Sequence, residues 1–184
     1  MIATSNCQPP SAFCRCPDCG QVQAPSVLDA DIGLCPSCAA WDDLLHAVHH
    51  HAPHLWAAGT VLPDLEATTS HQAISEIVEA LALEAGLSEQ LSETIVKAFL
   101  FDQEVASTAI DHGLAMLHIA HPAVTEPVAS VARSQFGVDF GSPDGLPAKV
   151  FVLLVSPPRS PAEHLRLTAA AARLLREYGR RTAP

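Results

Sequence analysis

The chain has 184 residues, enough for one domain of ordinary size with a small appendage. Hydrophobic residues make up 48% and charged residues 16%, which excludes a disordered chain and favours a packed globular protein. Ten Lys and Arg against twenty Asp and Glu give a formal net charge of -10, so we expect no nucleic-acid partner. No stretch approaches the roughly 18–20 apolar residues of a membrane span, and the first residues lack a secretory signal. We therefore expect a cytoplasmic protein without a membrane span.

All six cysteines lie in the first 38 residues, and four of them form two CPxC steps separated by fifteen residues. This spacing is typical of a structural zinc site, because each short turn directs two thiolates toward one tetrahedral ion. We predict a zinc ribbon over residues 1–41 with structural Zn²⁺ on Cys16, Cys19, Cys35 and Cys38. One arginine against five aspartates between residues 12 and 43 favours a protein partner or a scaffolding role over nucleic acid. Cys7 and Cys14 are surplus to the four ligands.

Residues 42–59 are predicted to form a short helix and a linker. Asp42 and Asp43 are suited to cap this helix, and Pro53 is expected to close it. Five histidines fall within this zone, at positions 46, 49, 50, 51 and 54. Their i,i+4 pairs are compatible with metal chelation, whereas a solvated linker is the simpler interpretation.

The main domain is predicted over residues 60–184, where helix and strand patterns alternate. A short strand at Val61–Leu62 precedes a helix capped at Thr68–Ser70 and ended by Gly86, and a second helix begins at Ser88. The predicted apolar positions of the first helix are Ala73, Ile74, Ile77, Val78 and Leu81.

Three strands and a helix are predicted to follow. The strands cover residues 113–119, a segment around 127–133, and the apolar run 150–155. The prolines at 157–161 lead into a last helix, whose apolar positions are predicted to be Leu165, Ala169, Ala172 and Leu175. The predicted fold class is an α/β (α+β) sandwich, with a mixed β-sheet flanked by helices and a small N-terminal zinc ribbon.

Taken alone, His118 is a single histidine in an apolar strand, for which a core position is the usual explanation. Its context is more informative, because the run ASTAIDHGLAMLH ending at His118 resembles the signature of the phosphotransferase-system IIA domain of the fructose, mannitol and nitrogen-regulatory type. In that family the signature ends in the histidine that takes the phosphoryl group. Further matching blocks are HPAV at 121–124, GVDF at 137–140, PDG at 143–145, VFVLLVSP at 150–157 and EHL at 163–165.

The resemblance implies a phosphocarrier that accepts a phosphoryl group on His118 from an HPr-like donor and serves regulation rather than sugar transport. His164 then corresponds to the family's second active-site histidine, Thr108 to a hydroxyl donor near the phosphate, and Gly113 to a position of close backbone approach. The implied partners are the HPr-like carrier and a downstream protein.

The chain departs from the family pattern around the signature. Asp102 stands where the family has an arginine, Leu117 replaces the proline before the histidine, and Ala109 and Asp111 replace glycines. Arg133 and Arg159 are candidates for the missing cation. Two functions therefore stay open: a working phosphoacceptor, or a degenerate IIA-like domain that acts as a protein-binding or sensing module tethered to a zinc ribbon.

Overall fold

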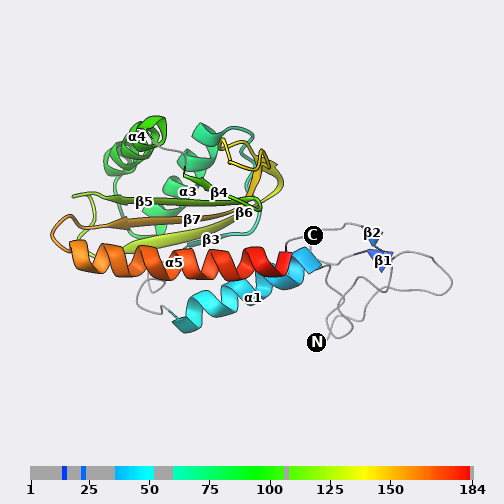
Figure 1. The fold of residues 1–184 in the computed structure, drawn as a ribbon. Coiled ribbons are helices and arrows are strands. Elements are labelled where there is room, and N and C mark those ends of the chain that lie inside the picture. The colour runs from blue at the N-terminus through cyan, green and yellow to red at the C-terminus, as the bar shows by residue number, and fades with distance from the viewer. Residues whose placement is uncertain (1–13, 16–21, 24–35, 52–59, 106–107, 183–184) are drawn as a thin grey trace.

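The structure is a computed structural model that describes residues 14–15, 22–23, 36–51, 60–105 and 108–182. Two short N-terminal strands, β1 (Cys14–Arg15) and β2 (Val22–Gln23), pair antiparallel. The rest of the described chain is a five-stranded mixed sheet with helices on both faces (Figure 1). This arrangement confirms the predicted sandwich of a mixed sheet flanked by helices.

The sheet has the strand order β3-β6-β7-β5-β4. Its strands are β3 (Thr60–Leu62), β4 (Ala109–Ile110), β5 (Leu114–Ala120), β6 (Val128–Val138) and β7 (Ala148–Ser156). β5 runs parallel to β7, and β3 runs parallel to β6, whereas the β6–β7 and β4–β5 pairs are antiparallel. The predicted strands are all present, and β6 and β7 extend beyond their predicted ends.

Two helices cover one face of the sheet. α3 (Ser70–Glu84) begins at the N-cap Thr69, which forms a capping box with Gln72. α4 (Glu89–Val105) follows, with the Ser88 side chain accepting a hydrogen bond from the Leu91 backbone N–H at 3.4 Å. The predicted apolar positions of α3 are all buried, and with Ile95 and Phe99 of α4 they form a core against this face.

The other face is covered by α1 (Pro36–His51) and α5 (Pro161–Thr182), which lie side by side in Figure 1. Trp41, Leu44 and Val48 of α1 pack with Leu175 and Tyr178 of α5 in a second core. The predicted helix start at Asp42 is wrong: α1 begins six residues earlier, and both capping candidates lie inside it. The first turn of α1 therefore contains Pro36 and Cys38 of the second CPxC step, where the sequence predicts part of a zinc ribbon.

The predicted apolar face of α5 is also partly wrong. Leu165 is 68% exposed and Ala169 is exposed, whereas the buried residues of α5 begin at Ala171. Burial there is set by contacts with the sheet and α1, and Gly179 packs directly against Leu114 of β5. The first three residues of α5, 161–163, are exposed, whereas His164 is half-buried.

Among the described residues, no helix is both long enough and apolar enough to cross a membrane.

Candidate functional site

His118 lies near the carboxyl end of β5, on the face of the sheet that α5 covers. Side chains alternate along a strand, so His118 shares a face with Leu114 and Met116, which pack in the core beneath α5. Both of those side chains are buried, whereas His118 is exposed. The strand therefore presents an imidazole at the end of an otherwise apolar row.

His164 meets His118 from the first turn of α5. The N–H of His164 donates to the Ser160 carbonyl at 3.0 Å, which fixes this turn at the end of the β7–α5 loop. The Nδ1 atom of His118 lies 3.2 Å from Nε2 of His164, and the ring centroids are 5.2 Å apart at an interplanar angle of 59°. The two histidines that the resemblance singled out are thus in direct contact, although 46 residues separate them.

Ser156 also contacts this pair of histidines, a role that was not predicted from the sequence. Ser156 ends β7 and is fully buried, and its Oγ lies 2.6 Å from Nδ1 of His164. Ser156 lies within the matching block VFVLLVSP, and the structure places it beside Ala120, two residues beyond His118 in the neighbouring parallel strand. A serine at a strand end is common, so the sequence alone did not distinguish it.

Partial burial of the His118 ring is the main influence that lowers its pKa below 6.5, and the neighbouring His164 lowers it further. Asp102 of α4 acts in the opposite direction, because its negative charge favours the protonated ring. The pKa of His121 is also lowered by burial, and its Nδ1 accepts a hydrogen bond from the Ala123 N–H at 3.2 Å. The net shift keeps the His118 ring neutral, with one nitrogen lone pair, at pH 7.

Thr108 and Gly113 are not part of the hydrogen-bonded contact between the two imidazoles. The Thr108 carbonyl accepts a hydrogen bond from the Met116 N–H at 3.0 Å, and its Oγ1 is buried without a partner among the residues that the structure describes. Gly113 has φ +73°, and an added Cβ would lie 3.2 Å from the Pro147 carbonyl oxygen. The close approach at Gly113 is therefore made by the protein's own backbone.

Asp144, in the loop between β6 and β7, accepts a hydrogen bond from the loop that joins β4 to β5. Its carboxylate accepts hydrogen bonds from the Ser142 Oγ at 2.6 Å, the His112 N–H at 2.6 Å and the Leu146 N–H at 3.0 Å. These bonds, led by that of Ser142, lower the pKa of Asp144 to about 2. His112 adopts a left-handed conformation with φ 69°, so the carboxylate stabilises a backbone geometry that a non-glycine residue rarely takes.

The two candidate cations have other roles in the structure. Arg133 donates from Nε to the Pro63 carbonyl at 3.1 Å and from Nη1 to the Cys38 Sγ at 3.4 Å, and it lies over the Trp41 ring. In the sheet register Arg133 pairs with Val150, four positions before the residue paired with His118. Arg159 lies in the loop before α5 and donates to the Thr125 carbonyl at 2.8 Å. Arg133 is therefore not the cation of the histidine site.

The predicted zinc ligands are described only in part. Cys16, Cys19 and Cys35 lie outside the described residues, whereas Cys38 is buried in the first turn of α1. In the histidine-rich zone, His46 is exposed, with Nε2 3.9 Å from the Asp42 carboxylate. Within the described part of the chain, no group of three or more His, Cys, Asp or Glu is arranged to hold a metal ion.

The fold and the paired imidazoles define a class of protein: an α/β domain that presents a histidine at the end of a parallel strand pair. Residues 55–181 match the family model for the phosphoenolpyruvate-dependent sugar phosphotransferase system, EIIA 2. The chain belongs to this family.

Individual relatives agree with this assignment. The chain is 32% identical over 123 residues to a nitrogen regulatory protein of Bradyrhizobium diazoefficiens, an alignment that covers 67% of this chain and 78% of the relative. It is 30% identical over 100 residues to a PTS system fructose-specific EIIA component of Haloferax volcanii, covering 54% of this chain and 64% of the relative. Among solved structures, the nitrogen regulatory protein IIA-Ntr of Neisseria meningitidis superimposes with a TM-score of 0.54 at 25% identity, covering 61% of this chain and 74% of that one.

Proposed function

We propose that this chain is a regulatory IIA protein that accepts a phosphoryl group on Nε2 of His118 from an HPr-like phosphocarrier. The observation that carries the proposal is the contact between Nδ1 of His118 and Nε2 of His164. This contact occupies one ring nitrogen of an exposed imidazole and leaves the other directed away from the pair. Membership of the EIIA 2 family and the similarity to nitrogen regulatory proteins support the phosphotransfer chemistry and the regulatory role.

The chemistry requires a particular proton arrangement. An imidazole attacks through a nitrogen lone pair, so Nε2 of His118 is nucleophilic only when the ring proton is on Nδ1. In that tautomer the Nδ1–H donates to Nε2 of His164. His164 thereby favours the reactive tautomer. As the hydrogen-bond acceptor, it also stabilises the positive charge that develops on the His118 ring during attack.

A direct test uses the purified chain and a phosphorylated HPr-like protein. The phosphoryl group is expected to appear as acid-labile phosphate on His118, and a His118→Ala variant is expected to take up none. His121→Ala is the matched control, because His121 lies three residues away and outside the contact between the two rings. Labelling of His118→Ala equal to that of the unaltered chain contradicts the proposal.

The second candidate function is a protein-binding or sensing module that has lost phosphotransfer. It is favoured by Asp102, whose carboxylate acts electrostatically on His118 and would repel an incoming phosphate. The same experiment separates the two functions, because absence of label on the unaltered chain supports the binding module.

We also propose that Cys16, Cys19, Cys35 and Cys38 hold a structural Zn²⁺. The spacing of the two CPxC steps supports this assignment. Cys38 fits the role, since its thiol lies at a helix N-terminus and accepts a hydrogen bond from Arg133, an electropositive setting that favours a metal-binding thiolate. Metal analysis is expected to find about one zinc per chain, lost in Cys16→Ser and retained in Cys7→Ser. Zinc retained in Cys16→Ser contradicts this ligand set.

A further inference from the structure

Ser156 makes a contact with the histidine pair that the proposed phosphoacceptor role does not itself require. Its Oγ lies 2.6 Å from Nδ1 of His164, and on the other side of that ring Nε2 lies 3.2 Å from Nδ1 of His118. The three side chains therefore form one continuous hydrogen-bonded row, from the end of β7 through the first turn of α5 to β5.

We propose that Ser156 is a positioning residue that holds the His164 ring against His118 in both the neutral and the protonated state of His164. The catalytic consequence rests on the proposed function, namely acceptance of a phosphoryl group by His118. The hydrogen-bonded arrangement of Ser156 and His164 does not depend on that function.

A hydroxyl is suited to this position because it both donates and accepts. When His164 is neutral, its Nδ1 is either a lone pair or an N–H, and the Ser156 hydroxyl serves either form. When His164 is protonated, both ring nitrogens are donors, and the Ser156 Oγ accepts from Nδ1–H while Nε2–H faces His118. An alanine at this position serves none of these states.

The burial of Ser156 makes the contact difficult to replace. Its exposed fraction is 0%, so bulk water does not reach the residue. Among the described residues, His164 is the one hydrogen-bond partner of its Oγ. Loss of the hydroxyl therefore leaves Nδ1 of His164 without this partner and frees the ring to rotate away from His118.

The proton balance of phosphoryl transfer gives the protonated state of His164 a role. Nε2 of His118 attacks phosphorus, the bond between phosphorus and the donor's imidazole nitrogen breaks, and its electron pair leaves with the donor ring. The donor ring takes a proton from solvent on its other nitrogen. The proton on Nδ1 of His118 moves to Nε2 of His164, which becomes an imidazolium that donates to His118 and to Ser156.

The test compares Ser156→Ala with Ser156→Thr, which keeps the hydroxyl, and with Ser130→Ala. Ser130 is a matched control because it is also a fully buried serine of the same sheet, and its Oγ has no hydrogen-bond partner in the described part of the chain. Two quantities are measured on the full chain: the ¹⁵N signals of the two histidine rings, and the rate of phosphoryl uptake from a phosphorylated HPr-like protein.

We expect Ser156→Ala to move the ring ¹⁵N signals of His164 and to slow phosphoryl uptake about 10-fold or more. Ser156→Thr and Ser130→Ala are expected to stay within about threefold of the unaltered chain. Ring signals or uptake rates in Ser156→Ala that match those of Ser130→Ala overturn the proposal. If the unaltered chain takes no phosphoryl group, the proposed function fails, and the ring signals alone decide the role of Ser156. If Ser156→Ala does not fold, a Ser156→Thr variant with altered ring signals and slow uptake overturns the proposal.

Discussion

The imidazole of His118 is subject to opposing electrostatic influences. Burial and the neighbouring His164 lower its pKa, and the carboxylate of Asp102 raises it. A nucleophilic imidazole must be neutral, so the balance of these influences sets the pH range in which His118 is able to accept a phosphoryl group.

This balance predicts the acid limb of the pH profile. Uptake is expected to be constant at neutral pH and to fall as the pH drops through the lowered pKa of His118, below 6.5. In His164→Ala the repulsion from the second ring is absent, so the pKa of His118 rises and the acid limb moves to higher pH. NMR titration of the ring signals measures both shifts. An acid limb above pH 6.5 in the unaltered chain would contradict a lowered pKa of His118.

Asp102 of α4 opposes the lowering of the His118 pKa. Asp102→Asn removes a negative charge that acts on His118, so phosphoryl uptake is expected to rise about fivefold. The pKa of His118 is expected to fall further, because the influence that raises it is gone. Glu93→Gln of the same helix removes an exposed charge that pairs with Lys97 and serves as the control. Equal rates in the two variants would show that Asp102 does not impede phosphate.

The sequence predicted the two histidines but not their hydroxyl partner. His118 and His164 were predicted because ordered blocks around them resemble a known family, whereas Ser156 lies in one of these blocks without a role that the resemblance assigns. The contact of Ser156 with His164 depends on the register of β7 against β5 and on the position of the first turn of α5. Such three-dimensional relations are not encoded in local spacing.

At the scale of the element, the β4–β5 hairpin shows how a backbone constraint supports the site. Gly113 adopts a left-handed conformation, and its carbonyl accepts hydrogen bonds from the Lys149 and Val150 N–H groups. The turn thereby anchors the start of β5, the strand that ends near His118. Both the conformation and the nearby Pro147 carbonyl oppose a side chain at this position.

Gly113→Ala is therefore expected to destabilise the protein by about 2–3 kcal/mol. Gly145→Ala is a matched control, because Gly145 has nearly the same φ of +72° and nothing within 4 Å of an added Cβ. It is expected to cost about 1 kcal/mol, the conformational part alone. Urea unfolding of the two variants measures the difference. Equal losses would show that the contact with Pro147 is relieved at little cost.

Helices defined by local signals were predicted better than helices defined by packing. α3 has a capping box and a regular apolar row, and its boundaries and buried face match the prediction. The start of α1 was placed too late because the CPxC step was interpreted as a metal-binding turn, although Pro36 is also suited to a first helical turn. The buried face of α5 depends on α1, which is distant in sequence.

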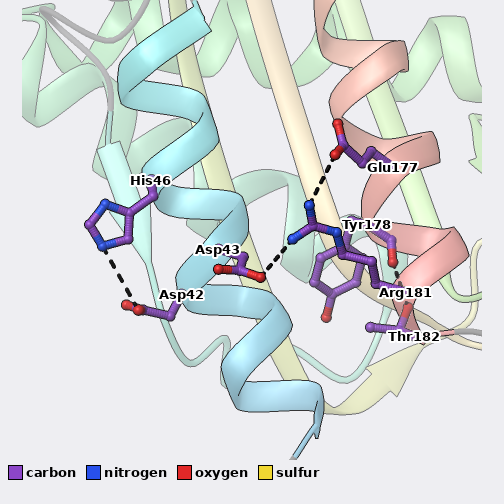
Figure 2. Close-up of polar contacts among 7 residues, drawn as sticks. All are labelled: Asp42, Asp43, His46, Glu177, Tyr178, Arg181 and Thr182. Atoms are coloured by element: carbon purple, nitrogen blue, oxygen red, sulfur yellow. Dashed lines mark hydrogen bonds and ion pairs between the residues drawn. The ribbon is translucent and has the colours of Figure 1, made fainter. Parts of the chain in front are cut away.

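At the scale of the whole molecule, α1 is part of the folded domain although it lies before the residues that match the family. Figure 2 shows its junction with α5, where Asp43 accepts a hydrogen bond from Arg181 at 2.6 Å and Arg181 also pairs with Glu177. These side chains are about half exposed, with Arg181 at 50%. Exposed pairs contribute little to stability, so the attachment of α1 must come mainly from its buried apolar residues.

Two variants separate these contributions. Leu44→Ala is expected to lower the free energy of unfolding by about 2–4 kcal/mol, because Leu44 is buried between α1 and the rest of the second core. Asp43→Asn, in the adjacent position, is expected to cost less than about 1 kcal/mol. Denaturant unfolding of the full chain measures both. A larger loss in Asp43→Asn than in Leu44→Ala would mean that the ion pair holds the helix.

Phosphoryl acceptance by His118 is tested most directly by ³¹P and ¹⁵N NMR of the chain after incubation with a phosphorylated HPr-like protein. We expect one phosphorylated histidine, His118, with phosphorus bonded to Nε2, because Nδ1 faces His164. Phosphorus on Nδ1 of His118, on another histidine, or on none would contradict it.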